Sequence, residues 1–303
     1  MTALLAAAGI AAAAAGLYAV WRAIWGYPDP SAPRVLAYHK TVRFKLGGTW
    51  VSPRRFERQI DALLGSGSRF IGETEFLLTL EGRRPGSAGE VLLTFDDGYE
   101  DFARHAAPVL EARGIPALIF LVSGYAGRRN EWELPAPGRG ARHMDWETVR
   151  GLCERGFSFG SHTVTHRPLT RLAPREAAAE LARSRRQIAE QTGRPVRSLS
   201  YPFGMADRRL ARAAREAGYR AAFVLAPPRG EKGADPFLLR RDGVWVIDTP
   251  WTIRTKLSRR GLFWLEDCKE RAISACSVLT PLATGAWRTG GSPDGGGGED
   301  AAG

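Results

Sequence analysis

The chain has 303 residues, which is long enough for one α/β barrel with terminal appendages. Its formal net charge of +11 comes almost wholly from arginine, and no basic run interleaved with aromatic residues appears. This pattern argues against nucleic-acid binding. Biased codon composition explains the charge as well as function does, and attraction to an anionic membrane surface or polymer is the more economical functional reading. The three cysteines, Cys153, Cys268 and Cys276, have no CxxC spacing and indicate neither a disulfide framework nor a cysteine zinc site.

The N-terminal segment is apolar. Residues 2–21 carry no charge and are about long enough to cross a bilayer as a helix, and Trp21, Trp25 and Tyr27 follow where an interfacial belt would lie. We expect residues 1–25 to form a transmembrane anchor or a signal peptide. The segment lacks the positive n-region of a secretory signal, which favours the uncleaved anchor.

Short apolar strands alternate with helices after a proline-rich linker at residues 26–33. We expect strands at 34–39, 69–71, 91–95, 116–122, 157–162, 198–203 and 221–225, and helices near 53–65, 100–113, 145–155, 174–192 and 206–217. This alternation predicts a parallel sheet, open or closed into a barrel. Residues 126–142 read as an insertion at the rim, and the low-complexity tail at 285–303 is expected to be disordered.

Two adjacent carboxylates, Asp96 and Asp97, follow the strand expected at 91–95, and Gly98 then breaks the apolar run. Adjacent side chains on a strand point to opposite faces, so both acids can serve one site only if the backbone turns there. The sequence Asp-Asp-Gly is also an ordinary turn. A strand end is where α/β folds build sites, and both readings stay open at this point.

A second polar cluster follows the strand expected at 157–162. His162 and His166 have the spacing of a metal-ligating pair, although Pro168 argues against a long regular helix. Ser161, Thr163 and Thr165 could support the imidazoles. Two imidazoles and one carboxylate from another strand end would bind zinc or iron(II) and leave coordination positions open, whereas a strand-end histidine can also be purely structural.

The stretches LTFDDGYED and SHTVTH resemble the first two motifs of the NodB-homology polysaccharide deacetylases, carbohydrate esterase family 4. The similarity covers roughly residues 34–257, and it implies a distorted (β/α)7 barrel, which we expect to occupy residues 34–284. The resemblance makes Asp97, His162 and His166 the metal ligands and Asp96 the general base. The metal implied is a divalent ion, Zn²⁺ ahead of Fe, Co or Ni.

The general acid departs from the commonest family pattern, since no histidine follows His166. His39, at the end of the first expected strand, is similar to the acid of the permuted subgroup that includes poly-N-acetylglucosamine deacetylases. A buried structural histidine is the alternative. In the same subgroup an arginine orients the base, and the doubled Arg240 and Arg241 leave that choice open beside a solvated surface pair.

The third motif, SYPFG, would form one wall of a substrate groove with Tyr201, Pro202 and Phe203, and a backbone N–H near Tyr201 would hold the oxyanion. An aromatic pair at a strand end is also ordinary core. Trp245 could line a pocket for the acetyl methyl group, although its Val-Trp-Val setting equally suits a plain barrel strand.

The resemblance therefore implies a metal-dependent enzyme that hydrolyses N-acetyl groups of N-acetylhexosamine units in a cell-envelope or exported polysaccharide. The alternatives are an O-acetyl esterase or small-amide hydrolase of the same fold, and a non-catalytic glycan-binding module. The expected partners are an acetylated polysaccharide or oligosaccharide and, through the N-terminal helix, a membrane. Family resemblance favours a catalytic domain on the outer face, whereas basic residues such as Arg22 and Arg34 after the apolar segment favour the cytoplasmic face. His105 and His143 are not expected to take part in catalysis.

Overall fold

The computed structural model describes residues 14–21, 23, 32–44, 48–130, 140–225, 235–258 and 263–277. The strands are β1 (Arg34–Tyr38), β2 (Lys40–Thr41), β3 (Trp50–Val51), β4 (Arg69–Phe70), β5 (Glu90–Phe95), β6 (Leu118–Leu121), β7 (Ser158–Ser161), β8 (Ser198–Ser200), β9 (Ala221–Val224), β10 (Leu239–Arg240) and β11 (Asp242–Gly243). The helices are α2 (Pro53–Gly65), α3 (Glu73–Leu80), α4 (Ala107–Glu111), α5 (Trp146–Glu154), α6 (Pro174–Thr192), α7 (Arg208–Glu216), α8 (Pro250–Ser258) and α9 (Phe263–Ser277).

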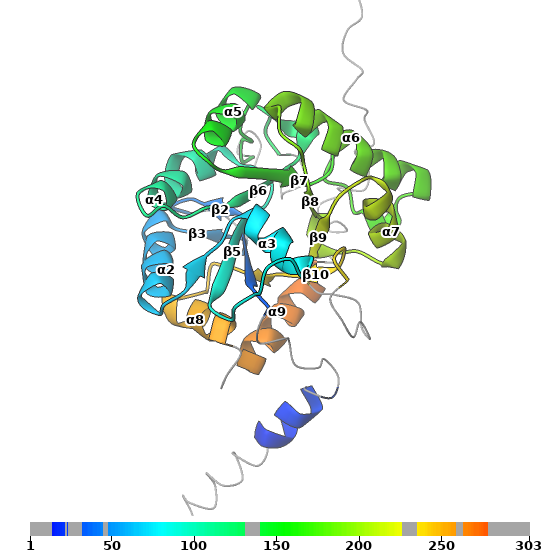
Figure 1. Ribbon diagram of the computed structural model, residues 1–303. Helices are drawn as coiled ribbons and strands as arrows, with labels where there is room; N and C mark the ends of the chain where they lie inside the picture. The colour runs from blue at the N-terminus through cyan, green and yellow to red at the C-terminus, as the bar shows by residue number, and fades with distance from the viewer. Residues whose placement is uncertain are drawn as a thin grey trace, which may run out of the picture.

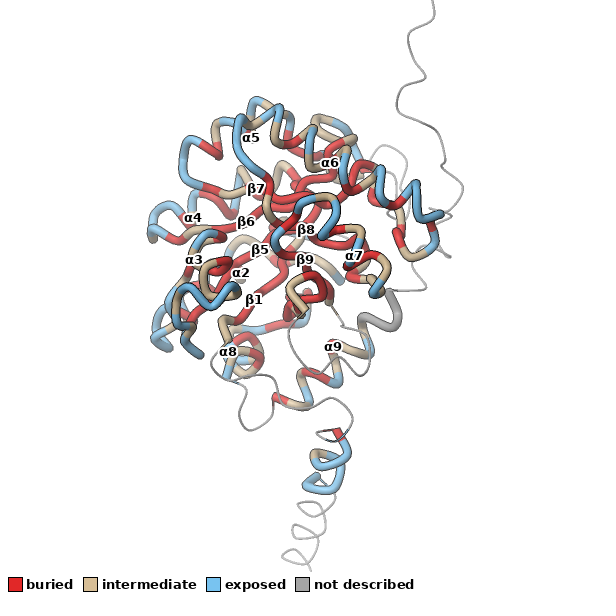
Figure 2. Tube along the Cα trace, turned by 45° about the vertical axis from the view of Figure 1, so that its right-hand side comes forward, coloured by how far each residue is buried: buried red, intermediate tan, exposed pale blue. Residues whose placement is uncertain are grey.

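The main sheet runs in the order β10-β9-β8-β7-β6-β5-β1-β11, with β4 beside β5, and its described strand pairs are all parallel. Helices surround this sheet (Figure 1), and the strands are buried while the outer helix faces are exposed (Figure 2). The expected distorted barrel is confirmed as a parallel sheet that is nearly closed on itself. β2 and β3 form a separate small ladder next to it.

The two ends of the sheet order are joined by a single residue. β10 pairs with β9, and β11 pairs with β1, yet only Arg241 separates the two strands in the chain. The Arg241 N–H donates to the Val224 carbonyl at 2.9 Å, and the Val244 N–H donates to the Ala37 carbonyl at 2.9 Å. Residues 239–243 therefore form the last strand position of the barrel, and they bend at Arg241.

The barrel interior is filled by apolar side chains and closed at one end by α3. The interior cluster consists of Val35, Ile71, Phe76, Leu77, Leu92, Leu118, Phe120, Ala221, Phe223 and Leu239. Phe76 of α3 packs on Phe223, and buried Glu73 of α3 accepts a 2.6 Å hydrogen bond from Ser198, the first residue of β8. Because α3 covers the end where strands begin, the polar residues that follow the strands lie at the opposite end.

Local sequence signals account for the helices that were predicted most closely. α2 begins after Ser52, whose hydroxyl accepts from the Arg55 N–H, with Pro53 as its first residue. α6 ends at Gly193, whose φ of 64° lies in the left-handed region. The helix expected near 100–113 is instead a π-helical turn at Phe102–Ala106 followed by the short α4.

The N-terminal segment is described only in part. Residues 14–21 and 23 are helical, and the buried Trp21 indole donates a 2.6 Å hydrogen bond to Asp267 of α9. Among the described residues, no helix combines the length and apolar character that crossing a bilayer requires. Residues 1–13, 22 and 24–31 lie outside the described residues, as does the tail expected at 285–303, so the expected anchor, linker and tail stay predictions.

Candidate functional site

The backbone turns directly after β5, at Asp97. Asp97 lies two residues beyond the end of β5 and has a φ of 69°, and Gly98 has a φ of 68°. A side chain at Gly98 would collide with Leu121, so glycine suits both the left-handed conformation and the close approach. This is the turn that two adjacent acids at one strand end need if both are to serve one site.

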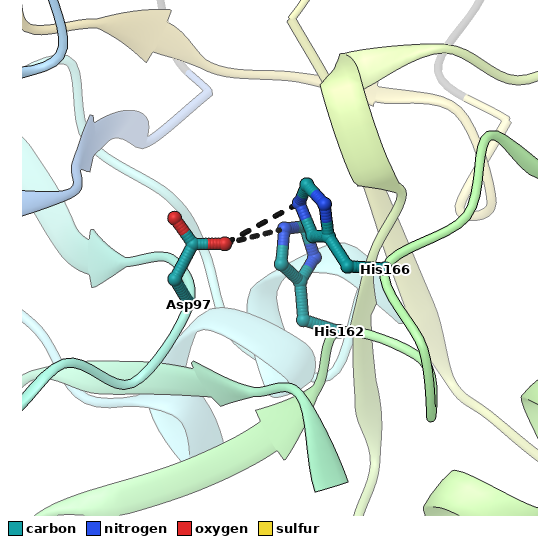
Figure 3. Close-up of side chains that lie close together, drawn as sticks. All are labelled: Asp97, His162 and His166. Atoms are coloured by element: carbon teal, nitrogen blue, oxygen red, sulfur yellow. Dashed lines mark ion pairs between the residues drawn. The ribbon is translucent and has the colours of Figure 1, made fainter. Parts of the chain in front are cut away.

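Asp97 meets two imidazoles that follow β7. Its Oδ1 atom lies 3.5 Å from His162 Nε2 and 3.3 Å from His166 Nε2, as Figure 3 shows. One ligand atom from each of the three residues falls within 4.8 Å of the others, and all three side chains are buried. The structure therefore brings together the three residues that the resemblance makes metal ligands.

The imidazoles are held by neighbouring backbone. His162 Nδ1 lies 2.7 Å from the Ser200 carbonyl, which can only accept, so Nδ1 carries the proton and Nε2 offers its lone pair to the site. His166 and Thr163 have φ values of 58° and 69°, and Glu180 of α6 accepts from the N–H groups of Val164 and Thr165 between them. Left-handed non-glycine residues of this kind concentrate where function requires a strained backbone.

The residues fit a divalent metal on two observations. Asp97 Oδ1 is buried and accepts no hydrogen bond among the described residues, which is costly for a carboxylate unless an ion binds it. Burial raises the pKa of Asp97, but His166 and His162 outweigh it and hold that pKa below its ordinary value. Burial lowers the pKa of His166 to about 3, so the carboxylate is ionised and this imidazole neutral near pH 7, as metal ligation requires.

Asp96 is held in place by Arg241. Two hydrogen bonds of 2.7 Å join the guanidinium to both oxygens of Asp96, and Arg241 also donates to Thr94 at 3.1 Å and to Ser200 at 2.8 Å. Although burial raises the pKa of Asp96, the Arg241 charge overcomes it and keeps that pKa well below the usual range.

Arg240 does not face the site. It forms ion pairs with Asp267, with Asp242 at 3.6 Å and with Glu270 at 3.6 Å. These contacts lie on the side of residues 239–243 that α9 covers. Placing it among the catalytic candidates was therefore wrong. Adjacent side chains of an extended segment point to opposite sides, so only one of the doubled arginines can reach Asp96.

His39 lies on the far side of Asp96, directly after β1. Its Nε2 atom is 3.8 Å from Asp96 Oδ2, and its side chain is 15% exposed. Burial lowers the pKa of His39, while Asp96 and Asp97 oppose that effect. His39 is thus another titratable group that the barrel end brings next to the metal-ligand candidates. A small approach would bring it close enough to Asp96 for proton exchange.

The third motif is divided between core and site. Tyr201 is fully buried, and its hydroxyl donates to the carbonyls of Phe237 at 3.1 Å and Leu210 at 3.4 Å. Its N–H donates to the Phe223 carbonyl at 3.1 Å, and buried Pro202 has no N–H. A place for Tyr201 in the groove wall does not fit these contacts, and neither its own N–H nor Pro202 can hold the oxyanion; another backbone N–H near Tyr201 stays a prediction for that role. Only half-buried Phe203 contacts the site, with its ring centroid 4.8 Å from that of His166.

Trp245 is buried at 5% exposure and follows β11 rather than lying within a strand. Its ring passes close to Gly243, where a side chain would collide with it, and its backbone N–H donates to the Asp248 carboxylate at 2.8 Å. A role in binding the acetyl methyl group stays a prediction.

His143 was not expected at the site. Its Nδ1 atom lies 2.7 Å from the Asp97 carbonyl, and its ring packs on Tyr99 with centroids 4.8 Å apart. Asn130 donates to the Tyr99 hydroxyl at 2.9 Å. No spacing pattern signals these contacts, because 46 residues, including α4 and β6, separate His143 from Asp97.

Comparison with known proteins supports the geometry. YxkH of Bacillus subtilis (strain 168), which carries the name of a polysaccharide deacetylase, is 27% identical over 213 residues, or 70% of this chain and 71% of that protein. A poly-beta-1,6-N-acetyl-D-glucosamine N-deacetylase of Staphylococcus aureus (strain MRSA252) is 25% identical over 180 residues, or 58% of this chain. The alignment spans 61% of that enzyme's length. The solved structure of IcaB from Ammonifex degensii superposes with a TM-score of 0.64 and 28% identity, covering 76% of this chain and 98% of that one.

The family model described as polysaccharide deacetylase matches residues 83–222. That range contains Asp96, Asp97, His162 and His166, whereas His39 and Arg241 lie outside it. The match, the relatives and the shared barrel agree with the motifs read from the sequence. The chain therefore carries a polysaccharide deacetylase domain of the NodB-homology type, with its barrel and a buried Asp-His-His site that fits a divalent metal.

Proposed function

We propose that the protein is a Zn²⁺-dependent N-deacetylase that acts on N-acetylhexosamine units of a cell-envelope or exported polysaccharide. The observation that carries the proposal is that the two adjacent acids after β5 have different partners. Asp97 joins two imidazoles, while its neighbour Asp96 is fixed by Arg241 and lies 3.8 Å from His39. The name of the staphylococcal relative supports an N-acetylated glycan as substrate.

Two imidazoles and one carboxylate suit Zn²⁺ and leave coordination positions open. When bound, the ion would polarise the acetamide carbonyl and make a water molecule more acidic. The residues that hold it are Asp97, His162 and His166. Glu180 and the Ser200 carbonyl keep the two imidazoles in place, so that little reorganisation accompanies catalysis.

Asp96 acts as the general base. Arg241 keeps its carboxylate ionised near neutral pH, so Asp96 has an oxygen free of a proton to receive one from the attacking water. The guanidinium also fixes the plane of the carboxylate. This positioning matters because proton transfer requires the donor and acceptor atoms to come within about 2.6–3.2 Å.

His39 acts as the general acid on the leaving amine. Burial disfavours the charged imidazole, so His39 is poised to give a proton away once it has received one. Its Nε2 atom lies 3.8 Å from the Asp96 oxygen, and a small approach would let the proton taken from water pass from Asp96 to His39. The amine can then leave in neutral form.

The test is acetate release by Zn²⁺-loaded protein from β-1,6- and β-1,4-linked N-acetylglucosamine oligomers and from acetylxylan. The proposal expects release from an N-acetylated oligomer, abolished in Asp96→Asn. Release from acetylxylan alone would replace it with an O-acetyl esterase. Binding of the oligomers without any release would replace it with a glycan-binding module.

Membrane anchoring through residues 1–25 and a catalytic domain on the outer face stay predictions from the sequence. A reporter fused to the C-terminus would decide on which side of the membrane the domain lies. Activity of the reporter only in the cytoplasm would contradict the outward orientation.

A further inference from the structure

The rim insertion extends to Met144, shortly before α5, and its last residues are paired with the turn that carries Asp97. Residues Tyr99 and His143 form an antiparallel bridge, the Met144 N–H donates to the Gly98 carbonyl at 2.9 Å, and the Glu100 N–H donates to the Arg142 carbonyl at 2.9 Å. The insertion is thus joined by backbone hydrogen bonds to the residues immediately after the metal-ligand candidate.

The His143 side chain adds a contact to Asp97 itself. Its Nδ1 atom lies 2.7 Å from the Asp97 carbonyl, and the ring is 2% exposed. A carbonyl can only accept, so Nδ1 carries the proton and donates it. Tyr99 and Tyr125 hold the ring, with centroid distances of 4.8 and 5.6 Å.

This contact is made to a residue whose backbone conformation is unfavourable. Asp97 has a φ of 69°, a left-handed conformation that costs a non-glycine residue free energy unless its surroundings enforce it. Its carbonyl is held by the His143 side chain and the next carbonyl, of Gly98, by the Met144 N–H. Two consecutive residues of the insertion therefore hold two consecutive peptide groups of the turn.

The direction of the Asp97 carboxylate follows from that turn. In ordinary extended backbone the side chain after Asp96 would point to the opposite face of the strand. The left-handed turn redirects it toward His162 and His166, at 3.5 and 3.3 Å. Anything that lets the turn relax would move one of the three ligand atoms away from the other two.

We propose that His143 is a positioning residue for the metal centre: its Nδ1–H bond to the Asp97 carbonyl fixes the turn that aims the Asp97 carboxylate at the two imidazoles. His143 is not itself a ligand in this proposal. The inference rests on the metal site of the proposed function, and it makes the affinity for metal depend on a residue of the rim insertion.

The variants His143→Asn and His143→Leu test this proposal. The asparagine amide nitrogen stands close to the position of Nδ1 and keeps a donor, whereas leucine fills the space without one. We expect His143→Leu to weaken Zn²⁺ binding about 10–100-fold, as loss of a partner that orients a ligand does, and His143→Asn to recover most of it. Zn²⁺ affinity is measured on metal-free protein by competition with a chelator.

The visible absorption of Co²⁺-substituted protein is the second measurement, because it reports ligand geometry directly. We expect an altered spectrum for His143→Leu and a native-like one for His143→Asn. Exposed His105, changed to Leu, is the matched control and should change neither measurement. If His143→Leu fails to fold, His143→Gln replaces it, since its amide lies one bond farther out and misses the Asp97 carbonyl.

Native Zn²⁺ affinity together with a native Co²⁺ spectrum in the variant without the donor would overturn the proposal. Equal losses in the asparagine and leucine variants would also overturn it, because the hydrogen bond would then not be the cause. Neither measurement involves a glycan. A failure of the proposed deacetylation would show instead as intact metal binding without acetate release in the unchanged protein.

Discussion

Arg241 donates to both oxygens of Asp96 at 2.7 Å, although 145 residues separate the two in the sequence. Arg241 lies where the barrel closes, between β10 and β11. The guanidinium also lies over the rings of Phe120 and Phe223, with centroid distances of 5.4 and 5.9 Å. A planar, bidentate and stacked arginine of this kind has no equivalent in lysine.

Arg241→Lys should therefore reduce kcat about 10–100-fold while leaving metal affinity unchanged, because a single ammonium cannot fix the plane of the Asp96 carboxylate. Arg240→Lys is the matched control. It should lower thermal stability through its partners Asp267 and Glu270 but keep native kcat. Steady-state kinetics and melting curves measure both effects, and similar kcat values for the two variants would contradict the assignment.

The two neighbouring acids should separate cleanly by substitution. Asp97→Ala should abolish stoichiometric zinc binding, as should His162→Ala, because each removes one of only three ligands. Asp96→Asn should retain zinc and lose about 10²–10⁴-fold in acetate release. Zinc content by elemental analysis, set beside the rate of acetate release, checks both; loss of zinc in Asp96→Asn would reverse the roles.

Tyr201→Phe should act on stability rather than catalysis. The substitution removes the donor to the buried carbonyls of Phe237 and Leu210 and should cost about 1–2 kcal/mol of unfolding free energy. Because the hydroxyl lies in the core, KM and kcat should stay within about twofold of native values at temperatures below the transition. A raised KM without a loss of stability would restore Tyr201 to a substrate groove.

The metal-free protein should lose stability as the pH falls from about 6.5 to about 3. His166 takes up a proton near pH 6.5 when unfolded but only at about 3 when folded, because burial opposes the charged ring. The unfolded state binds more protons in this window, so the free energy of unfolding rises with pH and is lost on acidification. Its contribution is complete above about pH 6.5 and amounts to several kcal/mol, about 1.4 kcal/mol for each unit.

Chemical denaturation of metal-free protein between pH 3 and pH 7 measures this dependence. His166→Asn should flatten the slope, whereas His105→Gln, on the exposed surface of the π-helical turn, should leave it unchanged. An unaltered slope in His166→Asn would assign the acid sensitivity to other groups.

Much of the fold follows from local patterns. Ser52-Pro53 and Gly193 predict the ends of α2 and α6 because capping acts over a single turn. The strand ends that carry Asp97 and His162 are visible for the same reason, since an apolar run stops abruptly at polar residues. These local signals, with the family resemblance, were enough to select the three ligand candidates.

Features that depend on distant contacts could not be read in this way. β10 and β11 are two residues long each and have no period of their own, so the choice between Arg240 and Arg241 required the bend between them. Tyr201 sits at a strand end in either reading, and only its contacts with Phe237 and Leu210 place it in the core. No sequence pattern predicts the contact between His143 and the Asp97 carbonyl.

The bend at Arg241 also ties the candidate base to closure of the barrel. The guanidinium that holds Asp96 belongs to residues 239–243, whose pairing with β9 and β1 joins the last strand to the first. The residue that completes the circle of strands is thus the same residue that fixes the plane of the Asp96 carboxylate.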